Sequence, residues 1–461
     1  MQPNSKGTRI SRRHFLRGAT LTAAGFTVLP SHVLGLGGAT PPSEKLNVAG
    51  IGVGGQGAGD LSQLTSAGLR DEVNIVALCD VDSARAAGSF KRFPGAKPHK
   101  DFRKMLEEQK DIDAVVVATP DHVHAFASMM AIKMGKHVYC EKPLTHSVWE
   151  ARQVALAARE HKVATQMGNQ GQASEQTRVL SELILDGAIG PVREAHIWTD
   201  RPSNGLFNEY WPQGVGRPTE SPALPSTLDW DLWIGPAPFR PYHPAYVPFK
   251  WRGWWDFGTG GLGDIGCHSF DPVFRALKLG HPASVEASST RVNQETFPLA
   301  SMVTYQFPAR GDMPSVKLVW YDGGMRPPRP EELEEGRQMG ATGALLVGER
   351  GKILSQSRGY RIIPEARAKE YGEPPKKLPR SPGHHREWVE ACKGGQPAGS
   401  NFDWAGPLAE VVLLGNVALR LQLREELTKR KLLWDGPSLK ITNFEAANQF
   451  LRREYREGWA L

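Results

Sequence analysis

After residue 45, short apolar runs alternate with segments whose apolar residues recur at the spacing of a helix. The apolar runs lie within residues 45–52, 74–80, 113–120, 136–143 and 162–168. Residues 102–110, 122–135 and 147–161 carry the helical pattern. Strands and helices that alternate in this way are typical of a doubly wound parallel sheet. The pattern therefore predicts an α/β domain over about residues 45–168.

The second half of the chain has a different pattern. β-rich or alternating segments lie within residues 192–200, 283–293, 299–307, 315–322, 344–356 and 360–364. Between the first two, residues 201–257 are rich in Pro and Trp, and loops this long inside a compact domain are usually functional. Because the chain is longer than one core usually supports, we expect a second domain over residues 169–461. Its tryptophans suit the C–H faces of a carbohydrate, although core packing also explains some of them.

The first 39 residues have the composition of an export leader. The stretch "SRRHFLRGA" at residues 11–19 precedes a weakly apolar segment, and no acidic residue occurs before Glu44. The Arg12-Arg13 pair before an apolar run indicates a twin-arginine signal peptide over residues 1–39, to be recognised by the twin-arginine translocation machinery. The alternative is a disordered basic tail. Export would place the protein in the periplasm or another extracytoplasmic compartment.

Charge, hydropathy and cysteine content narrow the class of protein further. The chain carries a formal net charge of +7, but five of its positive charges precede residue 40, which leaves +2. A net charge this small does not indicate the basic surface that binds nucleic acid. After the leader, we expect no stretch long and apolar enough to span a membrane. Four scattered cysteines form no metal-type pair, and we expect buried thiols rather than disulfides.

A glycine-rich turn follows the first apolar run. Gly52, Gly54 and Gly57 fit the spacing G-x-G-x-x-G, which allows a tight turn, close approach of a pyrophosphate and helix–strand packing. Asp80 ends the next strand, where a carboxylate accepts hydrogen bonds from the adenosine ribose. It would repel a 2′-phosphate, so NAD is favoured over NADP. Alternatively, Asp80 is only a solvated strand-end residue.

Candidate catalytic groups occur in two segments. Lys142 follows a strand and should lie at the carboxyl edge of the sheet, where ligands bind in such folds. Asp264 and His268 are four residues apart and share a face if the segment is helical. An alcohol dehydrogenase needs such a base to take the hydroxyl proton. The alternatives are a surface lysine and, for Asp264, His268 and Asp271, a metal site; we expect no metal.

Several motifs together resemble a known family. The stretches "ATPDHVHA" at 118–125 and "CEKPLTHS" at 140–147 are similar to those of the Gfo/Idh/MocA oxidoreductases, which include glucose-fructose oxidoreductases and inositol dehydrogenases. Later stretches, such as "FKWRGWWDFGTGGLGDIGCHSFDP", resemble an exported bacterial branch. The resemblance implies a Rossmann domain followed by an α/β domain with a large open, mainly antiparallel sheet. Its face would cover the nicotinamide and form the substrate pocket.

The resemblance also implies roles for individual residues. Lys142 occupies the family's catalytic position, and Asp264 and His268 act with the lysine in inositol dehydrogenase relatives. The remaining assignments concern contacts: cofactor binding by Gln56, Thr119, Pro120, His124 and Glu141, and substrate binding by Asn169, Trp251, Arg252 and Asp271. For Arg252 a structural role against tryptophan is equally open. Family members often pair through their sheets, so we expect a dimer or tetramer.

These observations predict an exported NAD-dependent oxidoreductase of a sugar, polyol or glycoside. An exported dehydrogenase cannot exchange NADH for fresh NAD, so the cofactor must be tightly held and regenerated in place. One alternative is a redox-neutral glycosidase similar to glycosidase family 109, which oxidises a ring hydroxyl, eliminates the aglycone, adds water and reduces the product. Retention of Lys142 and Asp264, and no obvious spare acid for the leaving group, favour the oxidoreductase. A sugar-binding protein with a vestigial site is the other alternative.

Overall fold

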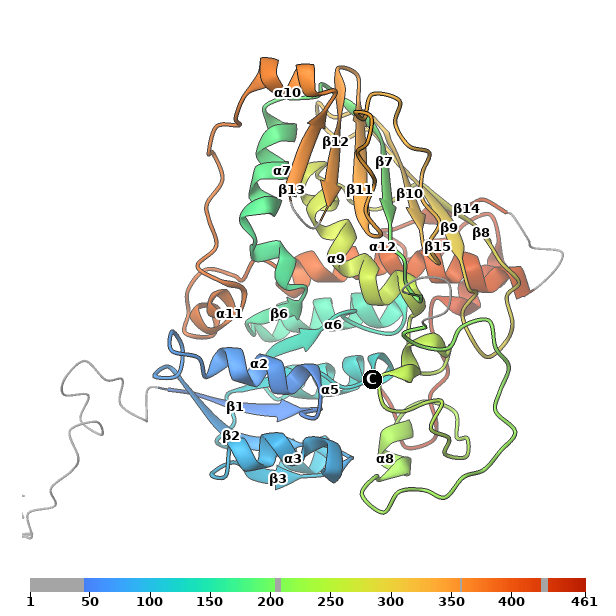
Figure 1. The fold of residues 1–461 in the computed structure, drawn as a ribbon. Coiled ribbons are helices and arrows are strands. Elements are labelled where there is room, and N and C mark those ends of the chain that lie inside the picture. The colour runs from blue at the N-terminus through green and yellow to red at the C-terminus, as the bar shows by residue number, and fades with distance from the viewer. Residues whose placement is uncertain (1–44, 204–208, 357–358, 424–429) are drawn as a thin grey trace, which may run out of the picture. The chain divides into compact units, whose positions relative to one another are not determined.

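The computed structural model describes residues 45–203, 209–356, 359–423 and 430–461, so the expected leader lies outside the described residues. The strands after residue 45 form two sheets (Figure 1). The first has the order β3-β2-β1-β4-β5-β6, and every pair in it is parallel. Its strands are β1 Leu46–Ile51, β2 Val73–Cys79, β3 Lys97–His99, β4 Ala114–Val117, β5 His137–Glu141 and β6 Thr165–Gly168. The predicted doubly wound sheet is confirmed.

Helices cover both faces of this sheet because alternate strand residues point to opposite sides. One face packs against α2 (Gln56–Leu64), α3 (Ser83–Arg92) and α11 (His384–Cys392), and the other against α4 (Phe102–Glu108), α5 (Asp121–Lys133) and α6 (Val148–His161). In β4, Ala114 and Val116 face the first layer, and Val115 and Val117 face the second. α11 comes from the distant carboxyl-terminal part of the chain, so the second half of the sequence contributes a helix to the first sheet's covering layer.

The second sheet is larger and mainly antiparallel. Its order is β13-β12-β11-β7-β10-β9-β8-β14-β15, and among the described strands only β7 and β10 pair in parallel. The strands are β7 Val192–Trp198, β8 Ser284–Ser289, β9 Ser301–Phe307, β10 Val316–Tyr321, β11 Gly343–Gly348, β12 Gly351–Gln356, β13 Gly359–Ile363, β14 Leu432–Asp435 and β15 Lys440–Ile441. The sheet implied by the family resemblance is therefore confirmed.

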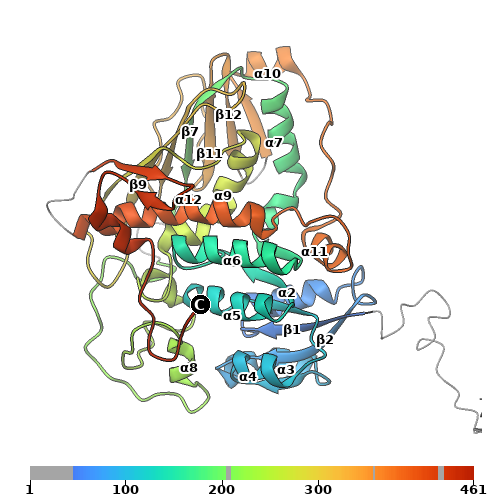
Figure 2. The ribbon, with the colours of Figure 1, turned by 180° about the vertical axis from the view of Figure 1, so that it is seen from behind.

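Helices α7 (Glu175–Leu185), α9 (Gly260–Ala276) and α12 (Phe402–Arg420) pack on one face of the second sheet (Figures 1 and 2). The remaining helices are short: α8 Trp230–Ile234, α10 Glu365–Tyr371 and the 3₁₀ turns η2 Gln170–Ala173, η3 Lys250–Gly253, η4 Leu421–Leu423 and η6 Glu445–Phe450. α9 begins at a run of glycines and carries Asp264 and His268 four residues apart, as predicted.

One helix contradicts the expectation that no later segment could span a membrane. Residues Phe402–Leu423 reach the required length and mean hydropathy, but 83% of the apolar window is buried inside the protein. This helix packs against α6, α9 and β8 in the largest apolar cluster. It is apolar because it lies in the core.

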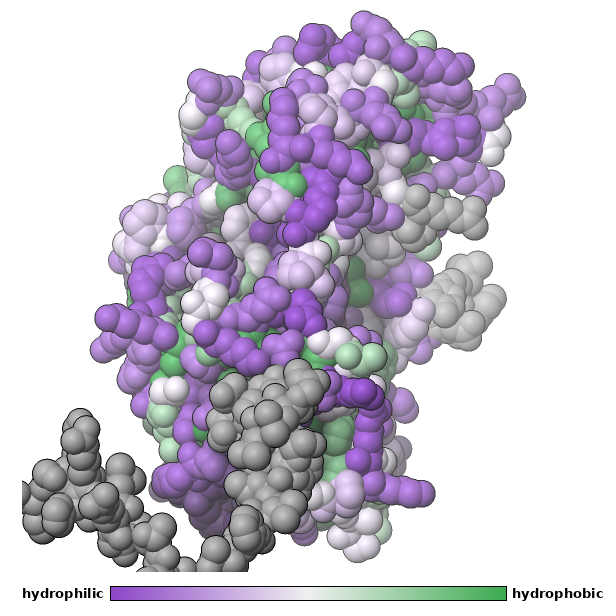
Figure 3. Space-filling model, turned by 90° about the vertical axis from the view of Figure 1, so that its left-hand side faces the viewer, coloured by the Kyte–Doolittle hydropathy of each residue, from purple (hydrophilic) through white to green (hydrophobic). Residues whose placement is uncertain are grey.

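Most tryptophans of the long loop region serve packing. Trp211, Trp254 and Trp255 are buried. Trp230 is also buried and stacks on Trp233 in a separate aromatic cluster. The four cysteines are free thiols, of which Cys392 alone is half-buried. On the face shown in Figure 3, hydrophilic side chains predominate and apolar ones form separate small patches.

Candidate active site

The glycine-rich turn between β1 and α2 is held so closely that larger residues do not fit. Gly52 has a φ of +80°, and a Cβ atom there would lie 2.7 Å from the carbonyl oxygen of Ala118. At Gly54 a Cβ would lie 2.5 Å from Cγ of Arg85, and at Gly57 2.2 Å from the Gly52 oxygen. The N-cap of α2, Gly55, provides no side-chain cap, which leaves the helix N–H groups for an anionic ligand.

Asp80 fixes this turn from the end of β2. Its Oδ2 atom accepts hydrogen bonds from the backbone N–H groups of Val53 at 2.9 Å and Gly54 at 3.0 Å. Its Oδ1 atom accepts one from Asp82 at 2.9 Å. Burial raises the pKa of Asp80, although these three bonds oppose the shift. The carboxylate thus shapes the glycine turn, and Asp80 also lines the cavity described next.

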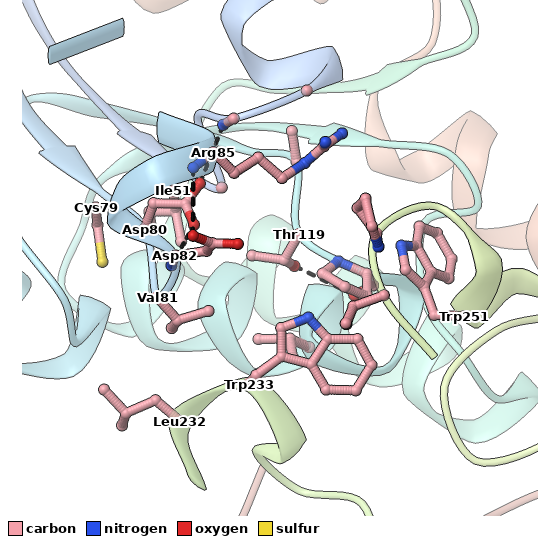
Figure 4. Close-up of a pocket in the computed structure, with 18 of the residues that line it drawn as sticks. Ile51, Cys79, Asp80, Val81, Asp82, Arg85, Thr119, Leu232, Trp233 and Trp251 are labelled. Carbon is pink, nitrogen blue, oxygen red and sulfur yellow. Dashed lines mark hydrogen bonds between the residues drawn. The ribbon is translucent and has the colours of Figure 1, made fainter. Parts of the chain in front are cut away.

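A cavity of about 300 Å³, here called the cofactor cavity, runs from this turn along the carboxyl edge of the first sheet (Figure 4). Nine of the residues assigned from the sequence to cofactor or catalysis line it: Gly52, Gly54, Gln56, Asp80, Thr119, Pro120, His124, Glu141 and Lys142. Trp251 and Arg252, assigned to substrate, line it as well. Gly57 lies beneath it, where the absence of a side chain lets α2 pack on β1.

Residues far apart in the sequence close the other side of this cavity. Leu228, Leu232 and Trp233 come from the region of α8, and Trp459 comes from the end of the chain. Trp459 packs edge-on against Phe126, with ring centroids 5.5 Å apart, and the Arg103 guanidinium lies 4.5 Å from its centroid. Sequence reasoning missed these residues because only the tertiary fold brings them to the cofactor cavity.

Arg85 is a second residue that sequence reasoning missed. It lies in the first turn of α3 and lines the cofactor cavity. Its Nη2 atom lies 3.1 Å from the Cβ position of Gly55, beside the turn that would hold phosphate groups. A guanidinium at this place suits a pyrophosphate. The sequence signal that could have identified Arg85 is its position five residues after Asp80.

Lys142 and Asp264 meet where the two halves of the chain join. The Nζ atom of Lys142 lies 2.7 Å from Oδ1 of Asp264 and 2.8 Å from its backbone oxygen. Arg252 Nε donates to the same Oδ1 at 2.8 Å, and its guanidinium stacks on Phe249 and Trp251. Burial alone would raise the pKa of Asp264, but Lys142 and Arg252 outweigh it and hold this pKa well below its usual value. Asp264 is therefore an ionised anchor for two cations.

His268 lies one helical turn beyond Asp264 on α9. Burial, followed by the Lys142 charge, lowers its pKa to about 3, and the Asp264 charge opposes this shift. Within the part of the chain that the structure describes, its ring makes no hydrogen bond. A neutral imidazole without a hydrogen-bond partner presents a free acceptor nitrogen to a substrate hydroxyl, although its low pKa makes it a weak base. The predicted trio of Lys142, Asp264 and His268 is thus brought together.

His124 and Glu141 support the edge of the cavity. The ring nitrogens of His124 lie 2.7 Å from the Pro143 oxygen and 2.8 Å from the Thr119 oxygen. Burial lowers the pKa of His124 to about 4. Burial raises the pKa of Glu141 to about 8, with the Asp60 charge as the next cause. His124 therefore ties together two segments that line the cavity.

A buried carboxyl group that sequence reasoning missed also lines the cavity. Burial raises the pKa of Asp121 to about 7, and a hydrogen bond from Thr259 opposes the shift. The Oδ1 atom of Asp121 has no hydrogen-bond partner among the described residues. Because a buried polar atom without a partner is costly, this atom is available to a ligand. The expectation that the site holds no spare acid is therefore wrong.

Two predicted substrate residues differ in their surroundings. Asn169 is 1% exposed at the end of β6, and neither polar atom of its side chain finds a partner among the described residues. Asp271, in contrast, accepts hydrogen bonds from Arg275 and from Trp404 Nε1 at 2.7 Å. Neither Asn169 nor Asp271 lines the cofactor cavity, and Asp271 joins α9 to α12.

The alternative of a metal site lacks support in the geometry. Within residues 45–203, 209–356, 359–423 and 430–461, no three His, Cys, Asp or Glu side chains are arranged to hold a metal ion. Asp264 is occupied by Lys142 and Arg252, and Asp271 by Arg275 and Trp404.

Comparison with known proteins agrees with this geometry. Residues 46–169 match the model of an oxidoreductase-family NAD-binding Rossmann fold, and residues 203–461 match the C-terminal alpha/beta domain of the same family. The chain belongs to the Gfo/Idh/MocA oxidoreductase family. The residues present also fit NAD: a glycine turn that excludes side chains, a helix α2 whose N-terminus has no side-chain cap, and Asp80 in the wall of the cavity. The first sheet with its helices is this family's NAD-binding domain.

The relatives that this chain resembles are named for different activities. An inositol 2-dehydrogenase of Rubrobacter xylanophilus is 33% identical over 32% of this chain and 42% of its own length. A glycosyl hydrolase family 109 protein of Shewanella pealeana is 29% identical over 40% of this chain and 44% of its own. The solved WlbA dehydrogenase of Bordetella pertussis, in complex with NADH and UDP-GlcNAcA, is 15% identical, with a TM-score of 0.58 over 85% of this chain and 99% of its own. The chain spans less than half the length of the inositol 2-dehydrogenase and of the family 109 protein.

Proposed function

We propose that the protein is an exported, NAD-dependent oxidoreductase that acts on a secondary alcohol of a sugar, polyol or glycoside. The observation that carries this proposal is the 2.7 Å contact between Lys142 and Asp264 at the rim of the cofactor cavity, with His268 on the next turn of α9. When bound in the cavity, NAD supplies the hydride acceptor.

The chain's own residues would handle the proton and the substrate oxygen. The Lys142 ammonium, neutralised by Asp264, donates a hydrogen bond to the oxygen of the reacting hydroxyl and stabilises its developing negative charge. The neutral His268 ring accepts the hydroxyl proton as hydride leaves; because the pKa of His268 is about 3, this transfer is coupled to the hydride step, which makes the proton on the substrate oxygen strongly acidic. Arg252 holds Asp264 in place from the other side, so that a single carboxylate orients both cations.

The aromatic lining of the cavity supports a retained cofactor. Trp233 and Trp459 line it from two distant segments and offer apolar ring surface to a bound cofactor. A cofactor that stays bound must be reoxidised in place, and a second carbonyl substrate would do this in a ping-pong cycle. This fits export as a folded, cofactor-loaded protein, which the twin-arginine machinery would carry out by way of the leader at residues 1–39.

The test is to purify the protein, denature it and assay the released nucleotide. We expect close to one NAD per chain that resists dialysis. A nucleotide-free protein that binds NAD only weakly would contradict the retained-cofactor mechanism. Export is tested separately: changing Arg12 and Arg13 to lysine should keep the protein in the cytoplasm without changing its NAD content. Light scattering would test the proposed dimer or tetramer.

A redox-neutral glycosidase is the second candidate, and two observations favour it. One is the similarity to the family 109 glycosyl hydrolase protein. The other is Asp121, whose pKa of about 7 keeps part of it protonated near neutral pH at the wall of the cavity. Such a carboxyl group is able to supply a proton to a leaving group. Lys142 and His268 still favour the oxidoreductase.

A further inference from the structure

A second cavity, of about 860 Å³, lies among the first residues of α6, the last two turns of α12, residues 255–259 and residues 449–455. It shares no lining residue with the cofactor cavity. Figure 2 shows α6 and α12 side by side at the back of the molecule. A volume of this size is within the range of small-molecule sites.

Three polar atoms of the lining have no hydrogen-bond partner among the described residues: Nε2 of His146, Oδ1 of Asn416 and Nε of Arg420. Each of these atoms is itself buried. The Asn416 amide nitrogen is already used, since it donates to the Thr259 oxygen at 2.8 Å. Because buried polar atoms normally find partners, the three atoms indicate a ligand with complementary groups.

Arg420 is the strongest of these signals. Its guanidinium makes neither a hydrogen bond nor an ion pair within the described part of the chain. It lies 5.4 Å from the ring centroid of Trp255 and 5.5 Å from that of Phe450. Burial lowers the pKa of Arg420, which reflects the cost of a cation held away from water. An anion placed in the cavity would offset that cost.

The other charged groups of the lining do not form an ion pair with Arg420 within the described residues. Asp256 attracts Arg420 but is bound to Arg240, Arg453 is paired with Glu150 at 2.8 Å, and Arg452 lies over the ring of Trp149. Glu454 is exposed at the surface. The walls include four aromatic rings, which offer apolar faces to a saturated ring: Trp255, Phe297, Phe450 and Tyr455.

The ligand must therefore supply an anion to Arg420, hydroxyl groups to His146 and Asn416, and an apolar ring face to the aromatic walls. We propose that the second cavity binds a sugar acid, a hydroxylated ring that carries a carboxylate. This site is separate from the redox site and does not depend on the proposed function.

The experiment uses the NAD-saturated full-length protein and isothermal titration calorimetry with three probes. D-Glucuronate carries both carboxylate and hydroxyl groups, D-glucose carries only hydroxyl groups, and inorganic phosphate is only an anion. We expect glucuronate to bind most tightly, and Arg420→Gln to weaken it by about tenfold or more. Arg420→Lys should retain part of the affinity. A trimer of galacturonate tests whether the acid is bound free or as part of a chain.

Arg430→Gln is the matched control, because Arg430 also stacks on an aromatic ring, Phe444, but lies outside the cavity. It should leave glucuronate binding unchanged. In the ligand-free protein Arg420→Gln should maintain or raise the melting temperature, which separates loss of binding from unfolding. The proposal is overturned if no sugar acid binds, if phosphate binds as tightly as glucuronate, or if Lys142→Ala rather than Arg420→Gln removes binding.

Discussion

Thr259 donates its hydroxyl hydrogen to Oδ2 of Asp121 across 2.6 Å, and so holds a buried carboxyl group at the wall of the cofactor cavity. The pKa of Asp121 is raised from a value near 4 in the unfolded chain to about 7, so the folded protein binds a proton that the unfolded chain has lost. Its contribution to stability is therefore complete below about pH 4 and disappears as the pH rises through 7.

Asp121→Asn should remove this pH dependence, because the amide is uncharged and still accepts the Thr259 hydrogen bond. Relative to wild type, the variant should gain on the order of 3 kcal/mol in unfolding free energy between pH 5 and pH 9. Urea unfolding at several pH values measures it. Thr259→Val is the control: losing the bond that lowers the Asp121 pKa should move the transition to higher pH. Equal pH profiles for wild type and Asp121→Asn would rule out a raised pKa.

Lys142→Ala and His268→Ala should each abolish turnover while fold and bound NAD remain. Each residue is assigned to charge or proton handling in the reaction, so the loss should fall on kcat, by about 100-fold or more. Steady-state kinetics and released-nucleotide assays measure the two quantities separately. If either variant instead unfolds or loses NAD, its role is structural.

Asp264→Asn should behave differently from these two variants. It leaves the cations of Lys142 and Arg252 without their shared carboxylate, so both activity and stability should fall, the latter by about 3 kcal/mol. Denaturant unfolding of Lys142→Ala, His268→Ala and Asp264→Asn measures the free energies of unfolding to be compared. Stability equal to that of Lys142→Ala would show that Asp264 does not anchor both cations.

The sequence predicted local and edge-of-sheet features well. The Gly52–Gly57 turn, Asp80 and Lys142 follow strands directly, and the carboxyl ends of parallel strands meet at one edge, so sequence position fixes their place. Trp459, Trp233 and Asp271 escaped this reasoning because their surroundings depend on how distant segments pack. Asp271 has the same helical spacing from His268 as a ligand would, yet Arg275 and Trp404 occupy it. Spacing alone cannot distinguish these cases.

Asp80→Ala should weaken NAD binding more than NADP binding. The change removes the ribose acceptor and the negative charge that would repel a 2′-phosphate, while Arg85 remains nearby as a phosphate partner. It also frees the N–H groups of Val53 and Gly54, so total affinity should drop. Fluorescence titration of stripped protein with both nucleotides measures the ratio. An unchanged preference would remove Asp80 from the ribose site.

Trp459→Ala should speed NAD release by about tenfold or more, because it removes an aromatic side chain from the wall of the cofactor cavity. The rate is measured by chasing bound NAD with excess labelled nucleotide. Phe239→Ala is the matched control, since Phe239 is an aromatic residue that is 65% exposed and lies outside the cavity. If both variants release NAD at the wild-type rate, the end of the chain does not retain the cofactor.

The two leading mechanisms differ in what they do to the carbon beside the oxidised one. With glycosides and free sugars supplied in deuterium oxide and no added NAD, a redox-neutral glycosidase should release aglycone and leave deuterium at that carbon, because its proton is removed and replaced. A ping-pong oxidoreductase should release no aglycone and should turn over only with a second carbonyl compound. Lys142 and His268 favour the second result, since together they suit alcohol oxidation.

Asp121→Asn sharpens the test: if Asp121 protonates a leaving group, the variant should lose aglycone release but keep alcohol oxidation. Catalytic aglycone release with deuterium at the ring carbon would contradict the proposed oxidoreductase function and support the glycosidase function instead.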